Sequence, residues 1–143
     1  MFKAFDKENL CKGITVRTEE KKRSVLIVDD EEAILFAFKD VLSGPWLSID
    51  TAQSIEEVRK FLLSTYYNGA VIDLRLGGSN GFEGFEAIRM VKERNPRCKV
   101  ILLTAYAQPG IRERALTEGA DFFIEKPVSP EDIKNVFMSE GVM

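Results

Sequence analysis

The chain has 143 residues, 45% of them apolar and 30% charged, which predicts a single globular domain large enough to bury its own core. Its net charge of −3 argues against a general nucleic-acid binder. No apolar run approaches the roughly 20 residues that a membrane span needs, and the first residues do not have the pattern of a signal peptide. Two cysteines make no disulfide framework and histidine is absent, so we expect a cytoplasmic protein that uses neither Ser-His-Asp nor Cys-His catalysis.

Residues 1–23 are predicted to form a charged arm outside the folded domain, which then spans residues 24–143. The arm carries seven basic and four acidic side chains, so its net charge is +3 and that of the remainder is −6. A solvated, partly disordered terminus explains this composition. An arm that docks on a partner or on the domain itself is the alternative.

The first half of the domain alternates strand and helix patterns. Residues 25–28 are an uninterrupted apolar run, typical of a buried strand. A helix follows, ended by Gly44-Pro45, and its apolar residues recur at helical spacing: Ile34, Leu35, Phe38, Val41 and Leu42. Residues 47–50 alternate like a half-exposed strand.

A second helix is opened by Ser54 and Glu57, which have the spacing of a capping box. Residues 70–72 then predict a second buried strand, followed by a glycine-rich loop. The third helix carries four apolar residues at helical spacing: Phe82, Phe85, Ile88 and Val91.

The last part of the chain repeats the alternation twice more. Residues 100–103 predict a third buried strand, and a helix with Ile111, Ala115 and Leu116 ends at Gly119. Residues 120–124 predict the last strand. Ser129 as cap and Pro130 at the first helical position begin a short final helix, with an apolar face of Ile133, Val136 and Phe137.

Five strand–helix units predict an α/β fold with a parallel sheet and helices on both faces. Strands one, three and four are continuous apolar runs and so belong in the middle of the sheet. The alternating strand two, and strand five with its Asp121, belong at the edges. The flavodoxin-like doubly wound order 2-1-3-4-5 satisfies both conditions.

Polar side chains follow four of these strands. Asp29 and Asp30 follow the first, Asp73 the third, Thr104 the fourth and Lys126 the fifth. In sheets of this order, ligands bind beyond the carboxyl ends of the strands, at the point where the strand order reverses. The sequence therefore predicts that these side chains converge at one edge.

Three neighbouring carboxylates repel one another, so either one keeps a proton or a cation binds. Oxygen ligands without histidine or thiolate favour Mg²⁺. An aspartate is also a known nucleophile that forms an aspartyl phosphate, while lysine and threonine stabilise phosphoryl oxygens. The residue set therefore fits phosphoryl transfer, which depends mainly on positioning and charge neutralisation.

Four segments together resemble the receiver domain of two-component response regulators: VLIVDDEE at 25–32, IDLRL at 72–76, LLTA at 102–105 and EKP at 125–127. The resemblance covers about residues 24–138. Each motif alone is weak, but all four occur in order, each at the end of its own predicted strand.

The resemblance implies that Asp73 is the phosphoacceptor. Mg²⁺ would be bound by Asp30 directly, by Asp29 largely through water, by Asp73 and by the backbone carbonyl of Arg75. Arg75 and Tyr106 occupy positions that tune dephosphorylation in receivers.

The resemblance also assigns the phosphate-binding and switch residues. Thr104 and the Ala105 amide would hold phosphoryl oxygens, and Lys126 would pair with the phosphate. Thr104 and Phe123 would act as the conformational switch. A cis peptide bond is expected between Lys126 and Pro127.

The chain departs from the family after the acceptor, where receivers often carry Met-Pro. Leu76-Gly77 stands there instead, followed by Gly78-Ser79-Asn80. Glycine is the residue that is most costly to order, so this change predicts a looser loop beside the acceptor.

Each of these residues also has an ordinary structural explanation. Asp29 and Glu32 have the spacing of a capping box, and Asp73 alone would be a strand-end turn residue. Thr104 and Lys126 are common residue types at the end of a strand and in a solvated loop. Phe123 is expected to be partly core whatever else it does.

The resemblance implies a receiver that takes a phosphoryl group from a sensor histidine kinase or a phosphotransfer protein. It would catalyse its own phosphorylation and dephosphorylation without being an enzyme in the usual sense. The output would be a downstream protein or a homodimer, reached through the face of the fourth helix, fifth strand and fifth helix. No direct nucleic-acid or membrane binding is expected.

Two alternatives remain. A pseudo-receiver would have the same fold and act as a binding module without phosphorylation. An aspartate-nucleophile phosphatase would usually place a second acid two residues after the nucleophile, where this chain has Arg75.

Overall fold

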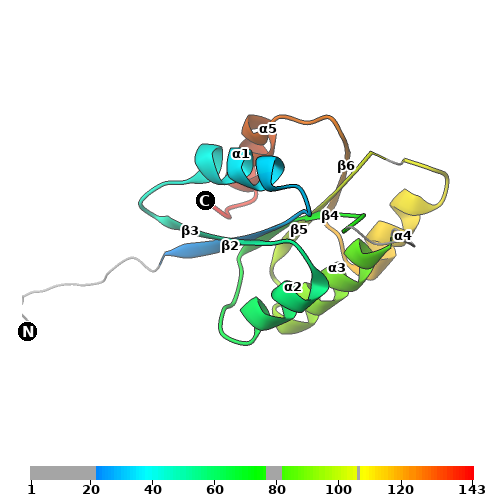
Figure 1. Cartoon of the computed structure of the whole chain (residues 1–143), viewed down its shortest axis with the longest axis horizontal. Coiled ribbons are helices and arrows are strands. Elements are labelled where there is room, and N and C mark those ends of the chain that lie inside the picture. The colour runs from blue at the N-terminus through cyan, green and yellow to red at the C-terminus, as the bar shows by residue number, and fades with distance from the viewer. Residues whose placement is uncertain (1–21, 77–81, 106) are drawn as a thin grey trace, which may run out of the picture.

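The structure is a computed structural model that describes residues 22–76, 82–105 and 107–143. The predicted arm up to residue 21, loop 77–81 and Tyr106 lie outside the described residues. Strands and helices alternate (Figure 1): β2 (Arg23–Val28), α1 (Glu32–Leu42), β3 (Leu47–Ala52), α2 (Ile55–Leu62), β4 (Gly69–Asp73), α3 (Glu83–Arg94), β5 (Lys99–Thr104), α4 (Ile111–Glu118), β6 (Phe122–Glu125) and α5 (Pro130–Ser139).

The five strands form one parallel sheet in the order β3-β2-β4-β5-β6. This order is the predicted 2-1-3-4-5, so the α/β flavodoxin-like prediction is confirmed. Helices α1 and α5 cover one face of the sheet, and α2, α3 and α4 cover the other (Figure 1). Among the described helices, none combines the length and apolar character that crossing a bilayer requires.

The central strands form the core because their side chains alternate between two apolar layers. Leu26 and Ile72 point into the layer beneath α2 and α3, whereas Ile27 and Val71 point into the layer beneath α1 and α5. All four side chains are at most 1% exposed. Burial on both faces explains why these strands are continuous apolar runs in the sequence.

Two helices begin as their capping patterns predict. The Ser54 side chain accepts a hydrogen bond from the backbone N–H of Glu57, and the Ser129 side chain accepts one from Asp132. Each hydroxyl satisfies a backbone donor that the first helical turn leaves without a partner. Pro130 occupies the start of α5, as predicted.

The start of the last strand differs from the prediction. β6 begins at Phe122, two residues later than expected, and Asp121 precedes it. The Asp121 carboxylate accepts hydrogen bonds from the Val100 backbone N–H at 2.8 Å and is paired with the Lys92 ammonium at 2.9 Å. These contacts fix Asp121 at the amino end of β6, just before the strand begins. The Asp121 carboxylate therefore does not lie among the side chains of the strand itself.

Helix α4 buries little apolar surface: within its described residues only Ala115 is fully buried, and Leu116 is 47% exposed. Arg114 provides a further contact between α4 and the aromatic side chains at the start of α3. The guanidinium carbon lies 4.5 Å from the centre of the Phe85 ring and 5.9 Å from that of Phe82. A cation over an aromatic face is attracted by the ring quadrupole.

Replacing Arg114 by methionine keeps a long apolar side chain but removes the charge, and with it the contact with the two rings and the 3.5 Å ion pair with Glu118. The free energy of unfolding is therefore expected to fall by about 1 kcal/mol. Urea unfolding measures this change. Arg97→Met is the matched control, since Arg97 is exposed and its guanidinium makes no hydrogen bond, ion pair or ring contact within the described part of the chain. Equal losses in the two variants would contradict the role of Arg114.

Candidate functional site

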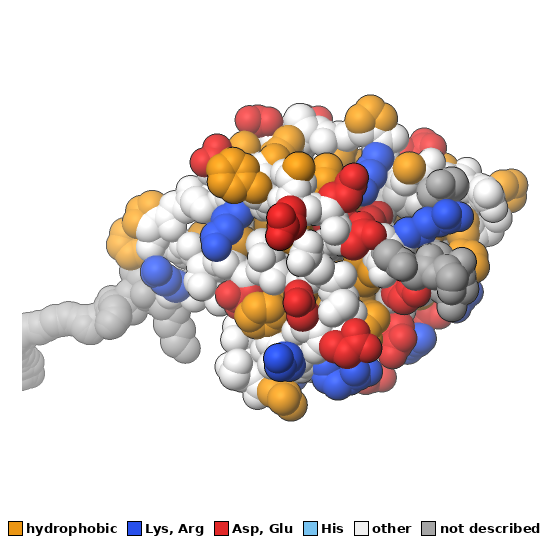
Figure 2. Space-filling model, viewed as in Figure 1, with side chains coloured by type: hydrophobic (Ala, Val, Ile, Leu, Met, Phe, Trp, Pro, Cys, Tyr) orange, Lys and Arg blue, Asp and Glu red, His pale blue; other side chains and the backbone are white. Residues whose placement is uncertain are grey.

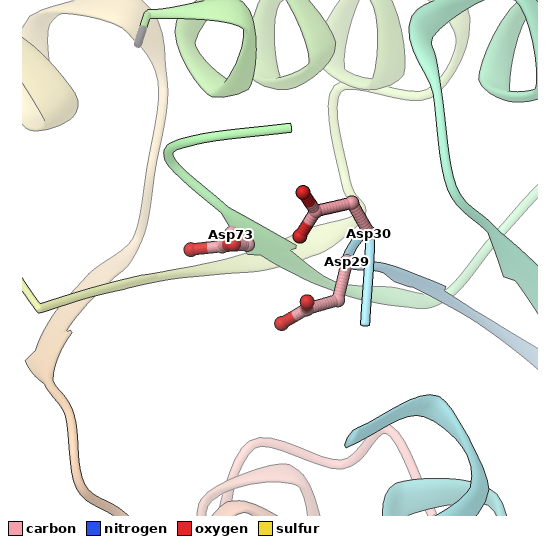
Figure 3. Close-up of side chains that lie close together, drawn as sticks. All are labelled: Asp29, Asp30 and Asp73. Atoms are coloured by element: carbon pink, nitrogen blue, oxygen red, sulfur yellow. The ribbon is translucent and has the colours of Figure 1, made fainter. Parts of the chain in front are cut away.

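Three carboxylates converge at the carboxyl edge of the sheet. Asp29 and Asp30 directly follow β2, and Asp73 is the last residue of the neighbouring strand β4. Each offers an oxygen, and these three oxygens lie within 4.8 Å of one another. Figure 3 shows the three side chains lying close together where their strands end, so the convergence that the strand order predicted is observed.

Lys126 joins the cluster from the far edge of the sheet. Its ammonium nitrogen lies 3.2 Å from Asp29 Oδ2 and 3.4 Å from Asp73 Oδ1. The Lys126 backbone N–H donates to the Thr104 carbonyl at 2.8 Å, which fixes the chain as it leaves β6. The peptide bond between Lys126 and Pro127 is cis, so that expectation is confirmed.

Burial dominates the electrostatics of Asp73, which is only 8% exposed. Desolvation and the negative charge of Asp29 raise the pKa of the Asp73 carboxyl to about 6, although Lys126 opposes this shift. For Lys126, burial lowers the pKa, but Asp73 and Asp29 raise it more, and the net shift is upward. The Lys126 side chain is therefore kept protonated, and its ammonium group supplies a positive charge beside the Asp29 and Asp73 carboxylates.

Asp29 links the site to the start of α1. Its Oδ1 accepts a hydrogen bond from the Glu31 backbone N–H at 3.0 Å, while Oδ2 faces Lys126. Asp29 and Glu32 do not form the capping box that was the alternative explanation. The N-cap residue of α1 is Glu31, and its side chain makes no capping hydrogen bond. The buried Asp29 is thus oriented by the turn and by the lysine together.

Three of the remaining predicted site residues lie at the same edge, whereas Phe123 lies within β6, opposite Leu102. Thr104 ends β5 and is 1% exposed, and Ala105 follows it on the exposed surface. Arg75 is exposed, two residues beyond Asp73. Phe123 lies on β6 and is half-buried, and the Arg112 guanidinium stands 5.7 Å from its ring centre.

Gly84 is a site-supporting residue that the sequence analysis did not single out. It lies in the first turn of α3, and its backbone N–H donates to the Leu74 carbonyl at 2.8 Å. A Cβ atom here would lie 2.6 Å from both the Asp73 carbonyl oxygen and Leu74 Cα. Only glycine therefore lets α3 rest on the end of β4. The sequence does carry a sign of this role, because glycine destabilises a helix and its presence there indicates a close contact.

The donor set fits a hard divalent cation. Carboxylate oxygens without nitrogen or sulfur are the ligands that Mg²⁺ prefers, and Mg²⁺ sites commonly use one or two carboxylates with several waters. Asp30 is exposed, whereas Asp29 and Asp73 are buried, so the cluster is reachable from solvent on one side. On the face drawn in Figure 2, acidic side chains gather with basic ones beside them.

Comparisons with known proteins define the family. The pattern of the response regulator receiver domain matches residues 25–137. A CheY-like response regulator receiver domain protein from Methanospirillum hungatei is 30% identical, with a TM-score of 0.75 over 85% of this chain and 94% of that one. The chain therefore belongs to the response regulator receiver family of two-component systems. The acidic cluster fits the phosphorylation site of that family.

Two curated relatives are similar over most of this chain. The photosynthetic apparatus regulatory protein RegA of Cereibacter sphaeroides is 30% identical over 119 residues, which is 83% of this chain. The alginate biosynthesis transcriptional regulatory protein AlgB of Pseudomonas aeruginosa is 32% identical over 117 residues, which is 82% of this chain. The matches span 63% of RegA and 25% of AlgB, so the shared part is the receiver domain.

Proposed function

We propose that the chain accepts a phosphoryl group on Asp73. The observation that carries this proposal is the Lys126 ammonium, which lies between the Asp29 and Asp73 carboxylates at the edge of a receiver fold. A buried nucleophilic carboxylate beside a fixed cation and two further acids is suited to phosphoryl transfer, because that reaction needs mainly positioning and neutralisation of charge. A relative supports it: the DrrB receiver domain, 25% identical with a TM-score of 0.71, is described as BeF₃-activated.

In the proposed reaction, an oxygen of the Asp73 carboxylate attacks the phosphorus of a donor. With a phosphohistidine donor, the P–N bond breaks and its electron pair returns to the imidazole nitrogen, leaving a mixed anhydride on Asp73. The Lys126 ammonium pairs with a phosphoryl oxygen, and the Thr104 hydroxyl and the Ala105 N–H donate to the others. Hydrolysis of the anhydride by water restores the carboxylate.

We propose that Mg²⁺ is held by Asp29, Asp30, Asp73 and the backbone carbonyl of Arg75. When bound, it neutralises charge on the carboxylates and the phosphoryl oxygens. The residues themselves orient the acceptor: the Glu31 N–H and Lys126 fix Asp29, and Lys126 also fixes one Asp73 oxygen.

The proposed output is a conformational change at Thr104 and Phe123. Thr104 would move towards the phosphoryl group and Phe123 would turn inward from beneath Arg112, altering the face of α4, β6 and α5.

The proposed partners are a sensor histidine kinase or phosphotransfer protein upstream, and a protein target or second copy on this face. We also propose a cytoplasmic location and no direct nucleic-acid contact by this domain. The proposed division into a charged arm and a receiver domain is kept, but Arg23, which was assigned to the arm, is the first residue of β2 and belongs to the domain.

Intact mass spectrometry after incubation with Mg²⁺ and acetyl phosphate tests the acceptor. The wild-type chain is expected to gain one phosphoryl group, Asp73→Asn none, and the exposed control Asp40→Asn the same as wild type. A chelator should abolish the gain. Phosphorylation of Asp73→Asn at the wild-type level would contradict the assignment.

The two alternatives give different results in the same assay. A pseudo-receiver would bind Mg²⁺ without gaining mass and without forming a stable beryllofluoride complex. A beryllofluoride complex without mass gain would instead indicate a short-lived phosphoryl group. A phosphatase would turn over a phosphate ester such as p-nitrophenyl phosphate, and Asp73→Asn would abolish that turnover.

A further inference from the structure

A cavity of about 270 Å³ lies at the opposite end of the sheet from the carboxylates. Arg23 and Leu47, which are paired at the amino ends of β2 and β3, both line it. Leu42, Trp46, Lys134 and Met143 complete most of its wall. The six-residue strand β2 separates the cavity from Asp29, a span of about 20 Å. The cavity is therefore distinct from the proposed phosphorylation site.

The cavity combines an apolar wall with two cations. Trp46 is 64% exposed there, which leaves a large aromatic surface uncovered. Lys134 is half-buried, and its ammonium makes no hydrogen bond or ion pair within the part of the chain that the structure describes. The Arg23 guanidinium donates to the Gly141 carbonyl, so it is fixed at the rim. An aromatic side chain next to a carboxylate would satisfy both features, because apolar area and positive charge are offered together.

The chain itself carries such a group next to the cavity. Residues 1–21 lie outside the described residues and join the domain at Lys22, one residue before Arg23. Their sequence includes Phe2 and the pair Phe5-Asp6, which is flanked by Lys3 and Lys7. The carboxylate offered to the cavity is therefore the single Asp6 group, in a segment that is basic as a whole. The intervening residues 7–21 reach at most about 50 Å when extended, which is ample for a return to the rim.

We propose that the N-terminal segment around Phe2, Phe5 and Asp6 docks in this cavity, with a phenylalanine ring on Trp46 and the Asp6 carboxylate beside Lys134. Docking within one chain is favoured because a short covalent link raises the effective concentration of the segment into the millimolar range. A second copy of the chain fits less well, because a two-fold symmetric contact would bring Arg23 and Lys134 of one copy close to Arg23 and Lys134 of the other. Figure 2 shows apolar side chains at the end of the molecule where β2 and β3 begin in Figure 1. The proposal does not depend on phosphorylation of Asp73.

Trp46 is the single tryptophan of the chain, so its fluorescence reports on the cavity. In the full-length chain, Phe2→Ser with Phe5→Ser is expected to raise the acrylamide quenching constant roughly twofold, because quenching follows the exposed area of the indole ring. Lys134→Glu should raise it in the same direction. The control Phe36→Ser removes a side chain on α1 that is 74% exposed and should leave quenching unchanged.

A peptide of residues 1–12 provides the complementary test. Added at about 1 mM to the Phe2→Ser/Phe5→Ser chain, it should restore most of the shielding, since that matches the effective concentration of a short linker. The same peptide with Asp6→Lys should restore less. Quenching that is unchanged by the two serine substitutions would overturn the proposal. Shielding that depends on protein concentration would also overturn it, and would indicate a second copy as the occupant.

Discussion

Replacing Gly84 by alanine is expected to lower the free energy of unfolding by about 3 kcal/mol, as overpacking against immobile atoms does. The added methyl would lie 2.6 Å from the Asp73 carbonyl oxygen and from Leu74 Cα, both backbone atoms that no side-chain rotation can move away. Alanine also favours a helix over glycine by roughly 1 kcal/mol, but this gain is smaller than the cost of the clash. The variant should therefore be clearly less stable.

Urea unfolding of Gly84→Ala and Gly44→Ala measures this effect. A Cβ at Gly44 meets no atom within 4 Å, so that control should change stability by less than about 0.5 kcal/mol. Since the clash falls on the backbone of Asp73, Gly84→Ala should also weaken Mg²⁺ binding in calorimetry. Equal stability of the two variants would show that α3 can move away from β4 at little cost.

The stability of the magnesium-free protein is expected to fall as the pH rises from about 4 to 7, because of Asp73. Its pKa is about 6 in the folded chain against 3.8 as the ordinary value. In this range the unfolded carboxyl loses its proton while the folded one retains it, so the folded state binds more protons. Raising the pH therefore favours unfolding. Two pKa units correspond to roughly 3 kcal/mol.

Urea unfolding with a chelator, at several pH values, tests this linkage. Wild type is expected to lose up to about 3 kcal/mol relative to Asp73→Asn between low and neutral pH, whereas the control Asp40→Asn should follow wild type. Added Mg²⁺ should restore stability to wild type at neutral pH, because binding to the folded state alone shifts the equilibrium. A pH-independent difference between wild type and Asp73→Asn would contradict the raised pKa.

The order of the sheet could be predicted because burial leaves a local pattern. Residues 25–28 and 70–72 are continuous apolar runs, and residues 47–50 alternate, which separates central strands from an edge strand. The capping residues Ser54 and Ser129 were predictable for the same reason, since each acts on a backbone group three residues away. The start of β6 was not, because Asp121 is held by Val100 and Lys92, which are distant in the sequence.

Local sequence patterns were enough to predict which residues meet at the site. Parallel strands in this order bring the residues that follow them to one edge, so Asp29, Asp73 and Lys126 had to converge there. The contact of Lys126 with both carboxylates, 97 residues from Asp29, became visible only in the folded chain. The same holds for the position of Gly84 against the Asp73 backbone and for the cavity that Trp46 and Lys134 share. Such contacts depend on how helices pack on the sheet to within an ångström or so, and no local pattern encodes that distance.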